Sequence, residues 1–401
     1  MRSLATELIG SVPRRVMLLI IILSINGLFL NYLIIVLSAY LPELGVSTET
    51  VGLILGAEGL SMAGFAIPLG VLSDRRGRKW ILIVGTIGAT PMFFVVASTL
   101  NPALLVIVGV LGGILEGAFL ATVNAMIADQ TTPENRDSAF TLSFILGGMG
   151  TSLGTAIPFF IPSLQGILGL DKHAVHVHLL ILFGLFSLLI PMALYFLLRD
   201  YQETLRPVKG LWKGKSTKNL LKFSGINSLI GLGAGFIIPL IPAWLYLKFA
   251  IPDTYSGPVL TISSFTIGLA AVFSPRLAKR LGLVKAISLT QALSLFFMVS
   301  LAFVGDPVTA AFLYVIRTML MNMANPLADS FLMGIVVPED RGFASSVNSV
   351  IWRIPNSVTT IIGGAILASG NFELPFLIAG AFYAVAIFLY YTTFKNTKAI
   401  S

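Results

Sequence analysis

Residues 70–80 read GVLSDRRGRKW and separate two long apolar segments. Between Asp74 and Lys79 only Gly77 is uncharged. A basic cluster that closes an apolar hairpin is typical of the cytoplasmic side of a membrane protein, where Lys and Arg are retained. The stretch therefore predicts a chain that crosses a membrane and exposes this loop to the cytoplasm.

The composition agrees with a membrane-spanning chain. Of the 401 residues, 56% are hydrophobic and 11% are charged, whereas soluble domains carry about 25% charge. The mean hydropathy is +0.91. The net charge of +8 is not gathered on a soluble domain, so we expect no nucleic-acid partner. The absence of cysteine excludes disulfides, thiolate metal sites and cysteine nucleophiles.

Twelve apolar runs are each near the ~20 residues that cross a bilayer as a helix. The runs are continuous instead of alternating, which favours helices over barrel strands, because in lipid each segment must satisfy its own backbone. The first run is too long for a signal-peptide core and is expected to be retained. The predicted spans are residues 16–40, 50–72, 80–98, 102–127, 139–162, 178–198, 221–247, 256–275, 285–304, 308–333, 343–368 and 374–394.

The basic residues predict an orientation. With the N-terminus inside, 22 of the 26 Lys and Arg face the cytoplasm, including Arg2, and only Lys172 and Lys248 lie outside. Arg317 and Arg353 fall within spans. This asymmetry places both termini in the cytoplasm.

The chain also repeats itself. Residues 133–136 (PENR) recur as residues 338–341 (PEDR), and the same offset of 205 aligns Gly77 with Gly282. Two loops that agree on one offset predict two halves in the same orientation. We expect an N-terminal six-helix bundle over residues 1–198, a basic cytoplasmic linker over 199–222 and a C-terminal six-helix bundle over 223–401.

The pattern G-x-L-x-D-R-x-G-R-K in residues 70–79 resembles the loop between the second and third helices of the major facilitator superfamily of secondary transporters. The resemblance implies an all-α integral membrane protein of twelve transmembrane helices, built as two pseudo-symmetric six-helix bundles that work by alternating access. In that family the aspartate docks at the start of the eleventh helix, and the arginine four residues later pairs with an acid that closes the fourth helix. The corresponding cytoplasmic gate comprises Gly70, Asp74, Arg75, Gly77, Arg78 and Asp129. A solvated helix end is the alternative for Asp129.

Four charged residues fall well inside predicted spans, where charges are costly and are functional candidates by default. Glu116 is the first candidate for proton coupling and Glu58 is the second. A glutamate away from bulk water has a raised pKa that a nearby arginine lowers, so a cycle that separates the two can load and release a proton. Alternatively, Glu116 forms a structural ion pair with Arg353 or Arg317.

Polar and aromatic residues in the spans are candidates for lining a substrate cavity. Hydrogen bonding between helices is the alternative for each of them. His173, His176 and His178 cluster in an outer loop, but no fixed set of carboxylates accompanies them, so no metal site is expected. The candidate cavity residues are Asn26, Asn31, Tyr32, Asn227, Tyr314, Arg317, Asn322, Trp352, Arg353 and Asn356.

The motifs of hydrolytic and nucleotide-driven enzymes (HExxH, GxSxG and the P-loop) are absent from the sequence, so the chain is expected not to be an enzyme. Residues 147–154 resemble the Gly-rich fifth-helix motif of the family's antiporters but lack its Gly-Pro pair and its closing Gly-Gly. We expect a monomer in the plasma (inner) membrane that exchanges protons for a small lipophilic or amphiphilic organic compound by export, with no cofactor. Proton-coupled uptake of an organic anion is the alternative, favoured if Arg317 and Arg353 both face the cavity unpaired. A non-transporting membrane receptor or scaffold is the alternative of another class.

Overall fold

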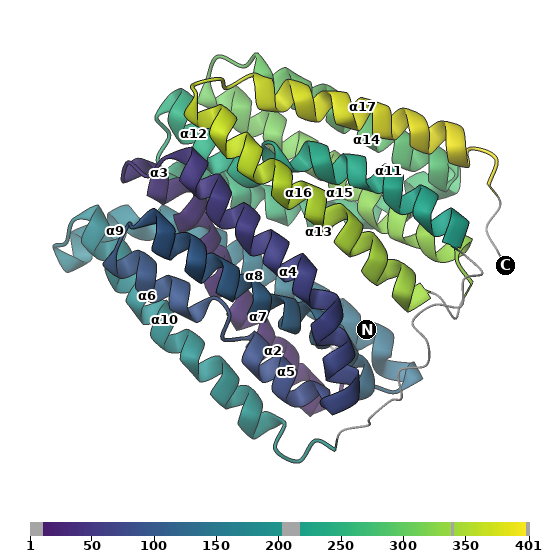
Figure 1. Ribbon diagram of the computed structural model, residues 1–401, viewed down its shortest axis with the longest axis horizontal. Coiled ribbons are helices and arrows are strands. Elements are labelled where there is room, and N and C mark those ends of the chain that lie inside the picture. The colour runs from purple at the N-terminus through teal and green to yellow at the C-terminus, as the bar shows by residue number, and fades with distance from the viewer. Residues whose placement is uncertain (1–10, 203–216, 338–340, 398–401) are drawn as a thin grey trace, which may run out of the picture. The chain divides into compact units, whose positions relative to one another are not determined.

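The computed structural model describes residues 11–202, 217–337 and 341–397, without the side chains of residues 133, 267–272 and 341–343 (Figure 1). Throughout these ranges the regular elements are helices, and no strand occurs in them. Arg2, most of the predicted linker and residues 338–340 of the second PEDR copy lie outside the described residues.

The first half of the chain contains long helices joined by short connections. They are α2 (Arg14–Ile35), the π-helical turn η1 (Val36–Tyr40), α3 (Leu41–Glu43), α4 (Thr48–Arg76), α5 (Arg78–Gly85), α6 (Thr90–Ser98), α7 (Pro102–Asp129), α8 (Pro133–Ala156), η2 (Ile157–Phe160), α9 (Ile161–Leu168) and α10 (Lys172–Leu197).

The second half follows the same plan. Its helices are α11 (Thr217–Gly235), η3 (Ile238–Leu240), α12 (Ile241–Phe249), α13 (Asp253–Leu281), α14 (Leu283–Ala302), α15 (Pro307–Ile335), α16 (Arg341–Ala368) and α17 (Leu374–Phe394).

Eleven segments of described residues are long and apolar enough to cross a membrane. They match the predicted spans to within a few residues, although the fifth extends to Leu168 because η2 and α9 continue it past Pro158. The predicted span 256–275 falls in α13, which is not among the eleven. The all-helical membrane fold is therefore observed, and the count of twelve stays a prediction.

The chain forms two compact units. One comprises residues 1–36 and 61–208, and the other comprises residues 37–60 and 209–401. The segment 37–60 belongs with the second unit because α4 packs closely on α16 there. A Cβ atom at Gly52 would lie 2.8 Å from the carbonyl oxygen of Thr360 and 3.0 Å from Gly364 Cα, so only small residues permit this approach. The predicted boundaries at residues 198 and 223 stay predictions.

In the first unit, glycines bring helix backbones together. Gly150 and Gly154 of α8 abut the carbonyl groups of Ser24 and Leu28 on α2. A Cβ atom at Gly85 would lie 2.5 Å from the backbone nitrogen of Phe119, which seats α5 tightly on α7. This packing holds α5 and α7 together next to the charged loop of residues 70–80.

In the second unit, a buried aromatic cluster holds α11, α15 and α17 together. It contains Phe223, Phe331, Tyr390 and Phe394, whose ring centroids are 5.1–6.3 Å apart. Edge-to-face and tilted ring pairs of this kind add to the stabilisation from apolar burial.

Candidate functional site

The turn between α4 and α5 depends on Gly77. Its φ of 104° and ψ of 149° lie in a region that is essentially restricted to glycine. The Gly77 amide still donates to the Ser73 carbonyl at 2.9 Å, which completes the last turn of α4. The chain then starts α5 at once with Arg78. This sharp reversal turns the arginine back toward the end of α4.

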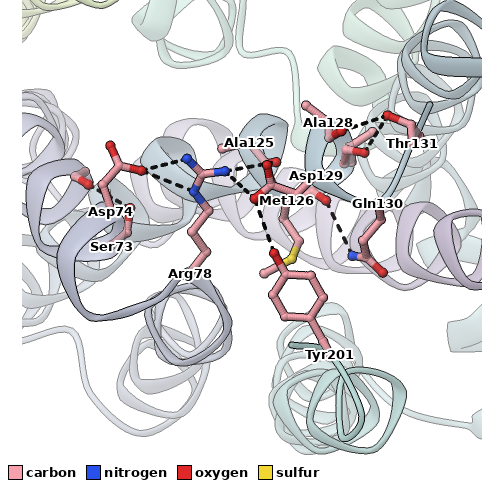
Figure 2. Close-up of polar contacts among 12 residues, drawn as sticks. Ser73, Asp74, Arg78, Ala125, Met126, Ala128, Asp129, Gln130, Thr131 and Tyr201 are labelled. Atoms are coloured by element: carbon pink, nitrogen blue, oxygen red, sulfur yellow. Dashed lines mark hydrogen bonds and ion pairs between the residues drawn. The ribbon is translucent and has the colours of Figure 1, made fainter. Parts of the chain in front are cut away.

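The guanidinium group of Arg78 lies between two carboxylates (Figure 2). Its Nη2 donates to Asp74 Oδ1 at 2.7 Å and its Nε donates to the same oxygen at 3.3 Å. Its Nη1 donates to Asp129 Oδ2 and to the backbone carbonyl of Ala125 at 3.4 Å. One arginine therefore joins the end of α4 to the last turn of α7.

The two carboxylates differ in exposure. The side chain of Asp129 is 6% exposed and that of Arg78 is 13% exposed, whereas Asp74 is 41% exposed. A buried ion pair strands an uncompensated charge when one partner is lost, at a cost of about 3–5 kcal/mol. An exposed pair is screened and contributes about 0–1 kcal/mol. The Arg78–Asp129 pair is therefore the stronger structural link.

Two residues that the sequence did not indicate as partners of the gate residues complete the end of α7. The hydroxyl of Tyr201, just beyond α10, donates to Asp129 Oδ2 at 3.2 Å (Figure 2). Arg136 donates from Nη2 to the carbonyls of Ala128 at 3.3 Å and Thr131 at 3.4 Å. A cation at a helix C-terminus satisfies carbonyls without helical partners and opposes the negative end of the helix dipole.

The end of α10 has a similar arrangement. Arg15 Nε donates to the carbonyl of Leu197 at 3.0 Å, and Lys79 Nζ donates to the carbonyl of Arg199 at 3.4 Å. Thus several of the basic residues that predicted the orientation also cap helix C-termini within the first unit.

Gly70 and Arg75 stand apart from this network. A Cβ atom at Gly70 would only reach ordinary contact with Ala121 Cβ at 3.6 Å, and the Arg75 side chain is exposed. The structure thus brings together Asp74, Arg78 and Asp129 from the predicted gate, with Gly77 shaping the turn.

Glu116 lies on the face of α7 that meets the interruption of the third span. This span is broken between α5 and α6, where Pro91 lacks an amide proton. A Cβ atom at Gly88 would lie 2.8 Å from the Gly112 carbonyl oxygen and 3.2 Å from Glu116 Cγ. Glu116 is half-buried there. Glu58, on the part of α4 that belongs to the second unit, is half-buried as well. The coupling roles of both stay predictions, as does an ion pair between Glu116 and Arg353.

In the first unit, two of the three candidate cavity residues make polar contacts between helices. Asn31 of α2 donates to the Thr151 hydroxyl of α8 at 3.3 Å and to the carbonyl of Gly27 at 2.8 Å. The Tyr32 hydroxyl lies 3.0 Å from Nδ1 of His176 on α10, and both residues are fully buried. Asn26 is 5% exposed.

In the second unit, asparagines join α11 to α16. Asn227 Nδ2 donates to Asn348 Oδ1 at 3.1 Å, and Asn356 Nδ2 donates to the carbonyl of Gly231 at 3.2 Å. Asn322 donates to the carbonyl of Thr318 within α15 at 2.9 Å. Trp352 and Arg353 are half-buried on α16. Hydrogen bonds between helices, the alternative for these residues, are thus present for Asn31, Tyr32, Asn227 and Asn356.

Arg317 is buried among neighbouring helices, with 4% of its surface exposed. Its Nη2 donates to the Tyr383 hydroxyl of α17 at 2.8 Å and lies 3.9 Å from Met298 Sδ of α14. Tyr314, one turn earlier on α15, is 7% exposed. The anion-uptake alternative is favoured if Arg317 and Arg353 both face the cavity unpaired, and the contacts of Arg317 with α14 and α17 do not favour it.

The three histidines do not converge. His176 pairs with Tyr32, and His178 Nδ1 lies 2.6 Å from the Ala174 carbonyl oxygen of its own helix. Within the described ranges, no group of three or more potential metal-ligating side chains occurs.

The helical fold and the charged loop define a membrane transporter of a recognised family. The sequence model described as Major Facilitator Superfamily matches residues 17–225 and 223–400. The chain belongs to this superfamily, whose members are multi-pass membrane transporters of small molecules and not enzymes.

Two relatives are named as resistance proteins. The chain is 25% identical over 369 residues to Multidrug resistance protein MdtG of Rahnella sp. (strain Y9602), a match that covers 85% of each chain. It is 28% identical over 154 residues to Quinolone resistance protein NorA of Staphylococcus aureus (strain MRSA252). That match spans 36% of this chain and 40% of NorA.

Solved structures share the fold. A crystal structure of a mutant of the nucleoside transporter NupG aligns with a TM-score of 0.75 at 15% identity, covering 95% of this chain and 99% of that one. The D-xylose-proton symporter aligns with a TM-score of 0.70 at 13% identity, covering 93% and 97%. These likenesses extend to the fold alone.

Proposed function

We propose that the chain is a secondary transporter that exports a small lipophilic or amphiphilic organic compound in exchange for protons. The observation that carries this proposal is the similarity to a multidrug resistance protein over 85% of both chains. The partial similarity to a quinolone resistance protein supports the same direction of transport. The setting is the plasma membrane, with both termini in the cytoplasm, as the distribution of Lys and Arg favours.

The Asp74–Arg78–Asp129 network supplies the proposed cytoplasmic gate. Alternating access requires a link that is firm in one state and released in the other. The buried Arg78–Asp129 pair supports a rigid base at the end of α7, and the more exposed Asp74 is the part available for a changing contact. Asp74 would then engage when the cytoplasmic side closes and release when it opens.

Glu116 is the proposed proton carrier, with Glu58 as second choice. The support is a half-buried carboxylic acid placed mid-helix beside a break in the neighbouring span. The protonation of this group would then follow the changing access of the site to water.

The test uses purified protein in liposomes with an imposed pH gradient and ethidium as a lipophilic cationic probe. We expect gradient-driven accumulation of the dye, abolished by a protonophore. Glu116→Gln keeps the shape but cannot titrate, so driven accumulation should vanish while dye-for-dye exchange survives. Glu134→Gln, an exposed glutamate at the start of α8, is the matched control and should transport normally.

Other outcomes have defined meanings. Dye movement that ignores the pH gradient would refute proton coupling. Full driven transport by Glu116→Gln would move the assignment to Glu58. If Glu116 has a structural role instead, Glu116→Gln should lower both the melting temperature and the rate of dye exchange. If Glu116 also forms an ion pair with Arg353, the double variant Glu116→Gln/Arg353→Gln should restore the melting temperature but not proton-coupled transport.

A further inference from the structure

A groove of about 520 Å³ runs between α14 and α17 in the second unit. These two helices pack along each other (Figure 1). The lining residues recur every three or four positions on one face of each helix, as a continuous groove requires. They are Lys285, Ser288, Leu289, Ala292 and Leu295 of α14, and Ala384, Ile387, Phe388 and Tyr391 of α17.

The length of the groove along the helices is about the thickness of one bilayer leaflet. From Lys285 to Leu295 the rise along α14 is about 15 Å at 1.5 Å per residue, which is half of the ~30 Å hydrocarbon core. The end of the groove opposite Lys285 is closed at Gly380 of α17, where a Cβ atom would lie 2.8 Å from Val299 Cγ2 and 3.6 Å from Leu295 Cδ1. Between this close approach and Lys285, the small side chains of Ala292 and Ala384 leave the groove open.

The polar residues gather at one end of the groove. Lys285 and Ser288 lie in the first two turns of α14, and Tyr391 lies in the last turn of α17. Lys395, four residues beyond Tyr391, is exposed at the same end of α17. The rest of the lining is apolar. A cation and an amphipathic phenol at one end of an apolar channel match the layers of a lipid leaflet.

Ser288 gives an independent sign of a ligand. The residue is 9% exposed, and within the described part of the chain its hydroxyl has no hydrogen-bond partner. Thr290 and Ser300 of the same helix instead donate to carbonyls one turn earlier, at 3.0 and 2.9 Å. A buried hydroxyl without a partner is costly, and this one belongs to the groove lining.

We propose that this groove is a binding site for one anionic phospholipid, whose acyl chain occupies the apolar channel and whose phosphate contacts Lys285 and Tyr391. A rotation of the buried Ser288 side chain toward the channel would let its hydroxyl donate to an ester oxygen of the same lipid. The leaflet is the one that holds the N-terminus of α14, the cytoplasmic leaflet by the distribution of Lys and Arg. The cytoplasmic surface carries anionic lipids that attract nearby basic residues, so the charges are complementary. This site is separate from the proposed gate and proton carrier.

The experiment measures lipid retention by native mass spectrometry on the purified full chain. Delipidated protein is incubated with phosphatidylglycerol or with phosphatidylcholine of the same acyl chains. We expect phosphatidylglycerol to be retained preferentially and to raise the melting temperature. Lys285→Ala should lower retention about fivefold, and Ala292→Phe should abolish it by filling the channel.

Three controls keep the result decisive. Lys279→Ala, which removes an exposed lysine at the end of α13, should leave retention unchanged, and Lys285→Arg should preserve it. Circular dichroism and size-exclusion chromatography establish that each variant is folded. Equal losses for Lys279→Ala and Lys285→Ala would show a general surface-charge effect and overturn the site. Equal retention of phosphatidylcholine, or unchanged retention by folded Ala292→Phe, would overturn it as well.

Discussion

The loops at residues 70–80 and 275–285 occupy equivalent positions in the two repeats and have the same backbone turn. Each follows a helix of 29 residues, α4 or α13. Each turns at a glycine that N-caps the next helix, with φ 104° and ψ 149° at Gly77 and φ 80° and ψ 156° at Gly282. The offset that aligns the repeats therefore aligns their backbone conformations too.

The side chains around the two turns differ. Lys279 stands where the first loop has Asp74, and Leu283 stands where it has Arg78. Leu283 packs against the buried apolar cluster of the second unit, whereas Arg78 joins two carboxylates. Glycine thus sets the reversal in both repeats, and the ion-pair network is a separate addition in the first. The comparison teaches that the turn alone does not bring three charged side chains together.

Arg78→Ala should have the largest effect, because it leaves the carboxylate of Asp129 buried with its main cation removed. We expect a loss of about 3–5 kcal/mol in the free energy of unfolding, measured by denaturation in detergent micelles. Arg75→Ala, which removes an exposed arginine three residues earlier, should change stability by less than about 0.5 kcal/mol.

The same measurement on Leu283→Ala sharpens the contrast between the repeats. It removes apolar packing only, so its cost should not depend on ionic strength. A loss for Arg78→Ala that is no larger than that of Arg75→Ala would contradict the electrostatic account of the first loop.

Gly77→Ala and Gly282→Ala should have similar, intermediate effects. Both positions have backbone angles that side chains with a Cβ atom rarely adopt, at a cost of about 1–3 kcal/mol. A Cβ atom at Gly282 would meet no atom within 4 Å, so the cost there is conformational alone. Melting temperatures of the two variants test the repeat. A melting temperature that falls for only one of the two variants would show that the two turns are not equivalent.

The sequence predicted the helices well, because about 20 continuous apolar residues are required to cross a bilayer. The resemblance paired Arg78 with Asp129, and the two side chains are bonded in the structure. A turn of fixed length and two helix ends suffice to place these two charges close together. Their action as a gate remains a prediction.

The contacts of polar residues inside the spans were less accessible to sequence reasoning. Successive side chains on a helix point about 100° apart. A small error in the predicted rotation of a helix therefore assigns a residue that packs against a neighbouring helix to the cavity. Arg317 and Tyr32 contact Tyr383 and His176, which are far away in sequence. Tyr201 follows no motif that would mark it as a partner of Asp129.

Among the variants that remove an interaction seen in the structure, Asp74→Asn is expected to have the smallest effect on stability. Its comparison is Lys279→Gln at the equivalent position of the second loop. Asp74 is 41% exposed, so its pair with Arg78 contributes at most about 1 kcal/mol. Lys279 makes no ion pair with any residue that the structure describes. Denaturation in detergent micelles should therefore show a small loss for the first variant and none for the second.

The distances across the cytoplasmic side distinguish a gate from a local support. If Asp74 also holds this side closed, removal of its charge should raise the inward-facing population about fivefold, the equivalent of ~1 kcal/mol. Distances between spin labels on the cytoplasmic ends of the two bundles should then lengthen, and less so in high salt. Lys279→Gln should leave these distances unchanged. Unchanged distances in folded Asp74→Asn would restrict the carboxylate to holding Arg78 in place, and an equal change in Lys279→Gln would show that both loops, not the first alone, control opening.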